Sequence, residues 1–180
     1  MGFYFEKLKI RIGETEEALF EEVVSAISCN TYSVFNLEKW TEDEDEYDAW
    51  CLEIDSDVKI FENAEDSDAV VALLKDYLVL LCRKLPEVPI ELVYTASHSA
   101  DDSTRCLLCN YADGVISGLE LWGAPSAIIC NECDEEFSYF DVGVYTGGTE
   151  LTCYECDAEI SVEEIIEGDG SLQEFEIVVE

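Results

Sequence analysis

The sequence predicts an α+β protein, and three observations support this class. In the first half, runs rich in branched and aromatic residues alternate with two helical patterns, in the order β-α-β-β-α-β. The second half holds three Cys-x-x-Cys pairs among short strand-like runs. The chain has 180 residues and is 48% hydrophobic, which suits one or two domains with a real core. We therefore expect two domains, over residues 1–98 and 99–180.

Six elements are expected in the first domain. The helix over residues 66–84 is apolar nearly all round, so it should be the most buried. In the strand over residues 47–55, Trp50, Leu52 and Ile54 alternate with Cys51, Glu53 and Asp55. The order resembles a ferredoxin-like sandwich, with two helices on one side of an antiparallel sheet, although a variant with swapped strand order would fit equally well. The expected strands cover residues 3–12, 32–40, 47–55 and 90–96, and the expected helices cover residues 14–28 and 66–84.

In the second domain, the cysteine pairs point to a metal. Pairs at Cys106/Cys109, Cys130/Cys133 and Cys153/Cys156 recur every 23 or 24 residues, after a small, polar stretch at 97–104 where the domain boundary is expected. Each pair resembles a zinc knuckle, a tight turn that offers two thiolates to one ion. Zinc takes four tetrahedral ligands, which two pairs about 15–20 residues apart can supply. Between the last two pairs, a strand over 137–145 and a turn at Gly147-Gly148 complete a resemblance to a zinc ribbon, which implies structural Zn²⁺. A short helix over 162–167 and a strand over 172–180 should close the chain.

The first pair leaves three arrangements open, because its spacing from Cys130 is also suitable. In one, the later two pairs hold a single zinc and the first pair stays free. In another, the first two pairs hold the zinc, and in the third, two metals bind with extra ligands. The first arrangement is favoured, since the segment between the later pairs has the pattern of one hairpin. The prediction is one Zn²⁺ at Cys130, Cys133, Cys153 and Cys156, with Cys106, Cys109 and the single histidine, His98, as an alternative or second site.

The charge of the chain restricts its partners. The formal net charge is -34, and residues 85–180 contain 22 acids and one base, Arg105. Direct binding to DNA, RNA or an anionic membrane is not expected, because phosphate contacts need Lys and Arg. Such a field favours a cationic partner. Adaptation to salt is the other explanation of an acidic surface.

We expect no enzymatic activity. The chain has one histidine, no phosphate-binding glycine loop and no nucleophile motif, and a site of four cysteines is closed to substrate. No secretory signal or membrane-spanning run is evident, so a cytoplasmic location is expected, in the host cytosol if a phage encodes the protein.

Alternate residues of a strand lie about 6.6–6.8 Å apart on one face, a spacing comparable with that of phosphates along a nucleic-acid strand. In acidity, size and lack of catalytic motifs, the chain resembles, as a class, the phage and mobile-element inhibitors that mimic DNA against restriction or CRISPR nucleases. That resemblance implies a basic nucleic-acid-binding protein as partner. A zinc-ribbon adaptor in transcription or translation, and an immunity protein against a basic nuclease toxin, are the alternatives. Carboxylates with the required spacing are Glu53, Asp55, Asp57, Glu174 and Glu176.

Overall fold

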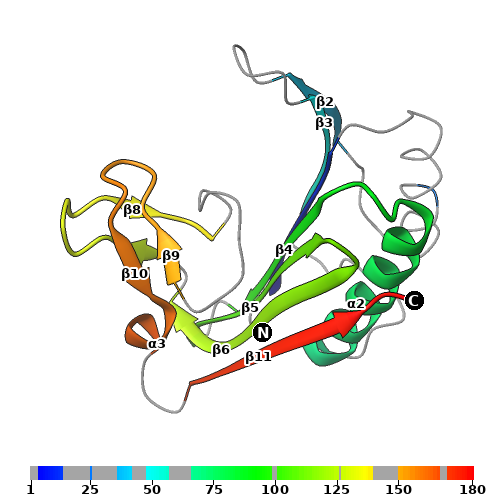
Figure 1. Cartoon of the computed structure of the whole chain (residues 1–180). Coiled ribbons are helices and arrows are strands. Elements are labelled where there is room, and N and C mark those ends of the chain that lie inside the picture. Colours follow the sequence, from blue (N-terminus) through cyan, green and yellow to red (C-terminus); the bar gives the residue numbers. More distant parts are fainter. Residues whose placement is uncertain are drawn as a thin grey trace.

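The computed structural model describes residues 4–13, 25, 36–41, 48–56, 66–98, 101–125, 127–139, 150–166 and 170–180. These residues form a mixed α+β structure built on a seven-stranded sheet in the order β11-β6-β5-β4-β1-β3-β2 (Figure 1). Every strand of this sheet is antiparallel to its neighbours. The strands are β1 (Tyr4–Ile12), β2 (Asn36–Thr41), β3 (Asp48–Ser56), β4 (Ile90–His98), β5 (Asp101–Ala112), β6 (Val115–Pro125) and β11 (Ser171–Val178).

Helix α2 (Ser67–Lys84) covers one face of the sheet (Figure 1). The Asp66 side chain caps its first turn by accepting a hydrogen bond from the Ala69 N–H at 3.0 Å. Arg83 and Lys84 lie in the last turn, where their positive charges interact favourably with the negative end of the helix dipole. The helix buries Val70, Leu74 and Leu78 among other apolar side chains. The prediction of a helix over residues 66–84 is confirmed, but the expectation that it is the most buried element is wrong: β5 is buried from Thr104 to Cys109, whereas α2 exposes residues such as Asp76 and Leu80. The helix expected over 14–28 lies almost wholly outside the described residues.

The core beneath α2 follows the alternation of the strands. Leu8, Ile10 and Ile12 of β1 are buried there, and the register places them opposite Ile54, Leu52 and Trp50 of β3. This register pairs the residues of β3 that were expected on one face with buried residues of β1. Among the described residues, no helix is both long and apolar enough to cross a membrane.

A second core lies on the opposite face, over β5 and β6. There Cys106 and Leu108 of β5 and Leu119 and Leu121 of β6 pack with residues of a smaller unit, residues 127–166, which we call the four-cysteine module. Figure 1 shows its hairpins beside the end of β6, away from α2. The module contains the strand pair β7 (Ile128–Ile129) and β8 (Glu136–Phe137), the strand pair β9 (Glu150–Thr152) and β10 (Glu159–Ser161), and helix α3 (Val162–Ile165).

The large sheet continues through the residues where a domain boundary was expected. Strand β4 ends at His98, β5 begins at Asp101, and the two strands are hydrogen-bonded neighbours. The polar stretch over 97–104 is therefore mostly strand. Strands β5, β6 and β11 extend the sheet that β1 to β4 begin, and the four-cysteine module packs on this extension.

Candidate metal centre

Two turns of the same geometry carry the cysteines of the four-cysteine module. In the first turn, the Cys130 N–H donates to Glu135 O at 2.9 Å, and the Asp134 N–H donates to Cys130 O at 2.9 Å. In the second turn, the Cys153 N–H donates to Ala158 O at 2.9 Å, and the Asp157 N–H donates to Cys153 O at 3.0 Å. Each turn is enclosed by its own short strand pair, β7–β8 or β9–β10.

The residue after each second cysteine reverses the chain. Asp134 and Asp157 have φ values of 59° and 58°, in the left-handed region that aspartate tolerates better than most residues. This reversal brings both sulfurs of a turn to one side. The described strands pair across each turn, β7 with β8 and β9 with β10, and the hairpin expected between the two turns stays a prediction. Most of the strand expected over 137–145 lies outside the described residues.

The four sulfur atoms lie close enough together to hold one metal ion. All four lie within 4.8 Å of one another, with Cys130 Sγ 3.6 Å from Cys156 Sγ and Cys133 Sγ 3.7 Å from Cys153 Sγ. A zinc–sulfur bond of about 2.3 Å in a tetrahedron separates the sulfurs by about 3.8 Å. The Cys130–Cys156 and Cys133–Cys153 distances are close to this value, and both contacts join one turn to the other. Four cysteines can therefore hold one metal ion here.

The electrostatics of the cluster also favour a cation. The backbone N–H groups of Glu132 and Cys133 lower the pKa of Cys130 to about 7. The N–H of Glu135 acts in the same sense on Cys133, but desolvation and the neighbouring thiols prevail and raise the pKa of Cys133 to about 12. One thiolate thus forms readily, and further negative charge beside it is opposed. A divalent ion removes this opposition, because it binds all four sulfurs as thiolates.

Packing holds the two turns together. Cys130 and Cys153 are buried in the second core, whereas Cys133 and Cys156 are exposed. Tyr154, in the second turn, places its ring edge-on to Phe137 with centroids 5.9 Å apart. Its hydroxyl donates to Glu135 Oε1 at 3.1 Å. The contacts of Tyr154 with Phe137 and Glu135 were not predicted from the sequence. The one sequence feature that pointed to them was an aromatic residue between the two cysteines of a predicted metal-binding pair.

The structure overturns the suggestion that Cys106 and Cys109 form a knuckle. Both lie within the regular strand β5 and are fully buried. Cys106 belongs to the core beneath the four-cysteine module, and Cys109 belongs to the core beneath α2. Residues three apart in a strand point to opposite faces, so these two thiols cannot bind one ion together. The side chain of His98 lies outside the described part of the chain.

The expected acidic positions fall into two groups. Strand register places Glu53 opposite Lys9, and Asp55 opposite Lys7. In the register, each of these expected carboxylate positions on β3 therefore has a lysine of β1 as its partner. Glu174 and Glu176 are exposed on β11, and their cross-strand partners on β6, Leu119 and Ser117, are not basic. Asp57 lies outside the described residues.

Arg105, the single base after Lys84, is buried between the sheet and α2. Its guanidinium donates to Glu120 Oε2 at 3.1 Å, pairs with Asp68, and lies 4.3 Å from the centre of the Trp122 ring. Lys75 of α2 pairs with the same Glu120. Arg105, which the sequence alone would allow to contact a partner, is therefore buried and paired within the protein. It does not offset the acidic surface of the four-cysteine module.

No family model, no curated protein and no solved structure matches this chain. The function must therefore be inferred from the donor set, the fold and the charge. Of these, the cluster of four cysteines is the best-defined chemical feature, and the distribution of exposed carboxylates is the next.

Proposed function

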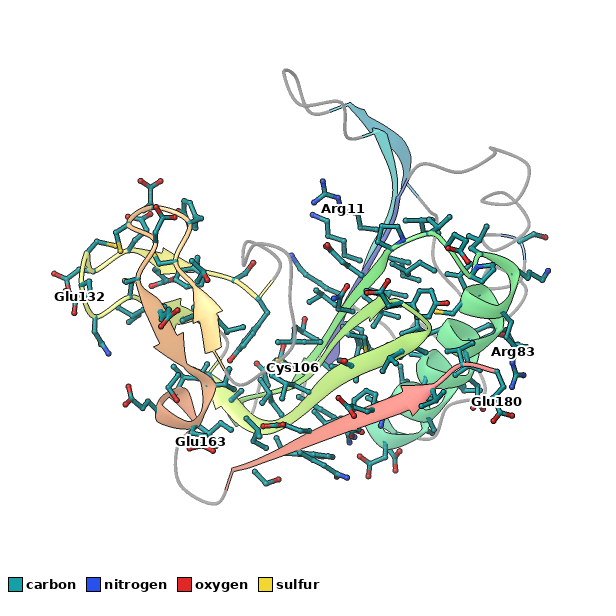
Figure 2. All side chains as sticks on the ribbon, in the orientation of Figure 1. Arg11, Arg83, Cys106, Glu132, Glu163 and Glu180 are labelled. Atoms are coloured by element: carbon teal, nitrogen blue, oxygen red, sulfur yellow. The ribbon has the colours of Figure 1, made fainter. Side chains whose placement is uncertain are left out.

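We propose that the protein is a non-enzymatic inhibitor of a basic nucleic-acid-binding protein, such as a nuclease or a defence complex, and that it acts by imitating nucleic acid. One observation carries this proposal: the described part of the four-cysteine module exposes nine carboxylates, while its residues include no Lys or Arg. Figure 2 shows two of them, Glu132 and Glu163, on its outer surface. The nine are Glu132, Asp134, Glu135, Glu136, Glu155, Asp157, Glu159, Glu163 and Glu164.

The metal centre adds to this charge. Four thiolates around a divalent ion have a net charge of about -2, which the surrounding carboxylates reinforce. Concentrated charge of one sign attracts an oppositely charged partner and accelerates its approach. A surface of this kind competes with phosphates for the Lys and Arg side chains that grip nucleic acid.

The proposal includes the identity of the metal and the architecture around it. Four cysteine sulfurs are the donor set of structural zinc sites, and such a set leaves no position for water or substrate. The two turns, each within a short hairpin, support a zinc ribbon over the four-cysteine module. The strand order β4-β1-β3-β2, with α2 between β3 and β4 in the chain, supports a ferredoxin-like unit over residues 1–98.

The test combines capture with inhibition. Purified protein of known zinc content is used to capture proteins from a host lysate at low and at high salt. Each captured nuclease or polymerase is then assayed for activity on duplex DNA with increasing amounts of the protein. We expect a basic enzyme that dissociates as salt rises, and inhibition that added DNA relieves. Capture of a toxin nuclease by the same acidic surface would identify an immunity protein instead.

Two triple variants identify the surface. Glu132→Gln/Glu136→Gln/Glu155→Gln neutralises three exposed carboxylates of the four-cysteine module, and we expect it to weaken inhibition at least tenfold. Asp76→Asn/Glu87→Gln/Asp113→Asn removes the same charge at exposed positions outside the module and should have a small effect. Equal effects of both variants would mean that only the net charge matters and would contradict the assignment to the module.

A second candidate, a protein–protein adaptor, is favoured by exposed apolar groups beside the ligands. Ile129, next to Cys130, is 57% exposed, and Tyr154, between Cys153 and Cys156, is 49% exposed. An adaptor would hold its partner at high salt, since apolar contacts are little screened. Ile129→Ser would then weaken capture more than the acidic triple variant does.

A further inference from the structure

Strand β11 forms one edge of the seven-stranded sheet. It pairs with β6 along all eight of its residues, and no strand of the described part of the chain pairs with its other side. Figure 1 shows β11 along the outer margin of the sheet. Alternate residues of an edge strand direct their N–H and C=O groups away from the sheet, where they can bind a further strand.

Apart from two exposed glutamates, this edge lacks the features with which proteins usually prevent strand addition. Edge strands are commonly interrupted by a bulge or a proline, or protected by lysine. The register from Ser171 to Val178 has no shift, and the strand contains no proline and no base. At its end, Val178 is 71% exposed. The backbone is therefore regular enough to pair over its full length.

Its side chains restrict which strand can be added. Glu174 and Glu176 point to one face and are exposed, while Phe175 and Ile177 point to the other face and pack partly against the core beneath α2. A second copy of β11, added antiparallel about Phe175, would place Glu174 opposite Glu176 twice. Like charges directly opposite destabilise a strand pair, so the edge disfavours its own copy.

From these features we propose that β11 is a docking edge that takes up an extended, basic segment of the partner as an eighth strand. The segment has Lys or Arg at two alternate positions, opposite Glu174 and Glu176. An apolar residue lies between them and extends the core at Phe175. This proposal rests on the proposed function, because it specifies how the basic partner is recognised: backbone pairing provides the contact, and the two carboxylates select the charge.

The test uses a defined peptide. A fluorescein-labelled, capped ten-residue peptide alternates lysine and valine at its centre. A second peptide has the same side chains but N-methyl groups on its four central amides, so it keeps the charge and cannot donate to the edge. Binding is measured by fluorescence anisotropy. Amide chemical shifts of residues 171–178 and of β6 are followed by NMR. We expect the first peptide to shift β11 and the N-methylated peptide to bind at least tenfold more weakly.

Two charge-matched variants locate the site. Glu174→Lys/Glu176→Lys should weaken the peptide about tenfold, because two favourable cross-strand pairs become unfavourable. Asp76→Lys/Glu87→Lys makes the same change at exposed positions outside β11 and the four-cysteine module, and it should alter the affinity by no more than about twofold. The proposal is overturned if the N-methylated peptide binds as well as the first, if both variants lose affinity equally, or if no peptide binds.

Failure of this proposal can be told from failure of the proposed function. If the protein inhibits a basic nuclease while neither peptide binds β11, the docking edge is wrong and the inhibitor stands. If the peptide binds β11 as described and no nucleic-acid-binding protein is inhibited, the edge stands and the inhibitor is wrong.

Discussion

The ring of Phe175 on β11 lies against Gly118, its cross-strand partner on β6. A Cβ atom at residue 118 would come within 2.9 Å of three atoms of that ring. The Lys75 ammonium of α2 also lies over the ring, 3.8 Å from its centre. The absence of a side chain at residue 118 therefore lets an aromatic residue of the edge strand cover β6 and meet the helix.

Replacing Gly118 with alanine should loosen β11. The added methyl group collides with the Phe175 ring, which must shift, and overpacking of this kind costs about 1–3 kcal/mol of unfolding free energy. Urea unfolding measures the loss. In a Phe175→Ala background the same change should cost much less, because the two residues act on each other directly. Equal costs in both backgrounds would show that the ring is not the cause.

Arg105→Ala should be among the more destabilising single changes. Among the described residues, the substitution leaves the buried Glu120 carboxylate paired with Lys75 alone. Breaking a buried ion pair lowers the unfolding free energy by about 3 kcal/mol or more. Asp68 is exposed, so its lost pair contributes little. Chemical unfolding measures the loss, and adding Glu120→Gln should restore part of it. If the double variant were as unstable as the sum of the two single variants, Arg105 and Glu120 would not be coupled.

Local patterns predicted much of this fold. The apolar run over residues 66–84 indicated α2, and strict alternation indicated β3. These signals lie within one element, so the sequence alone can express them. The pairing of β11 with β6 joins distant segments, which no local pattern specifies, and the polar stretch over residues 97–104 concealed the hairpin that β4 and β5 form. The continuous sheet was missed for these reasons.

The cysteine spacing likewise identified the four cysteines that cluster, together with one pair that does not join them. A knuckle turn exposes the two residues between its cysteines, and Asn131 and Glu132 are exposed in the first turn. Between Cys106 and Cys109, however, stand two leucines, both buried. Apolar residues at both intervening positions fit a strand buried on two faces, and that signal separates this pair from the two that cluster.

Metal content should depend on the exposed ligands of the four-cysteine module. We expect one zinc per chain, and less than a tenth of that for Cys133→Ser or Cys156→Ser, measured with a colorimetric chelator after protein denaturation. Without the metal, residues 127–166 should lose amide-exchange protection, because the four sulfurs join the two turns. Both cysteines are exposed, so the substitutions themselves disturb little packing.

The matched controls are Cys106→Ala and Cys109→Ala, which should keep one zinc per chain despite some loss of stability. Loss of metal from either control would restore the first cysteine pair as a ligand pair. Unchanged exchange protection in metal-free protein would mean that the metal is not structural.

Stability should fall at alkaline pH, partly because of Cys82 on α2. Burial raises the pKa of this thiol to about 12, from about 9 when exposed. Between these values the unfolded chain releases the proton and the folded chain keeps it. The contribution of the protonated Cys82 thiol to the unfolding free energy is therefore complete below pH 9. It is lost as the pH rises toward 12, by up to about 1.4 kcal/mol per pH unit. Cys82→Ala should show a shallower decline of unfolding free energy between about pH 9 and 11 in urea titrations under reducing conditions. Leu80→Ala, on the exposed side of the same helix, should leave the slope unchanged; parallel slopes for all three proteins would assign the decline to other groups.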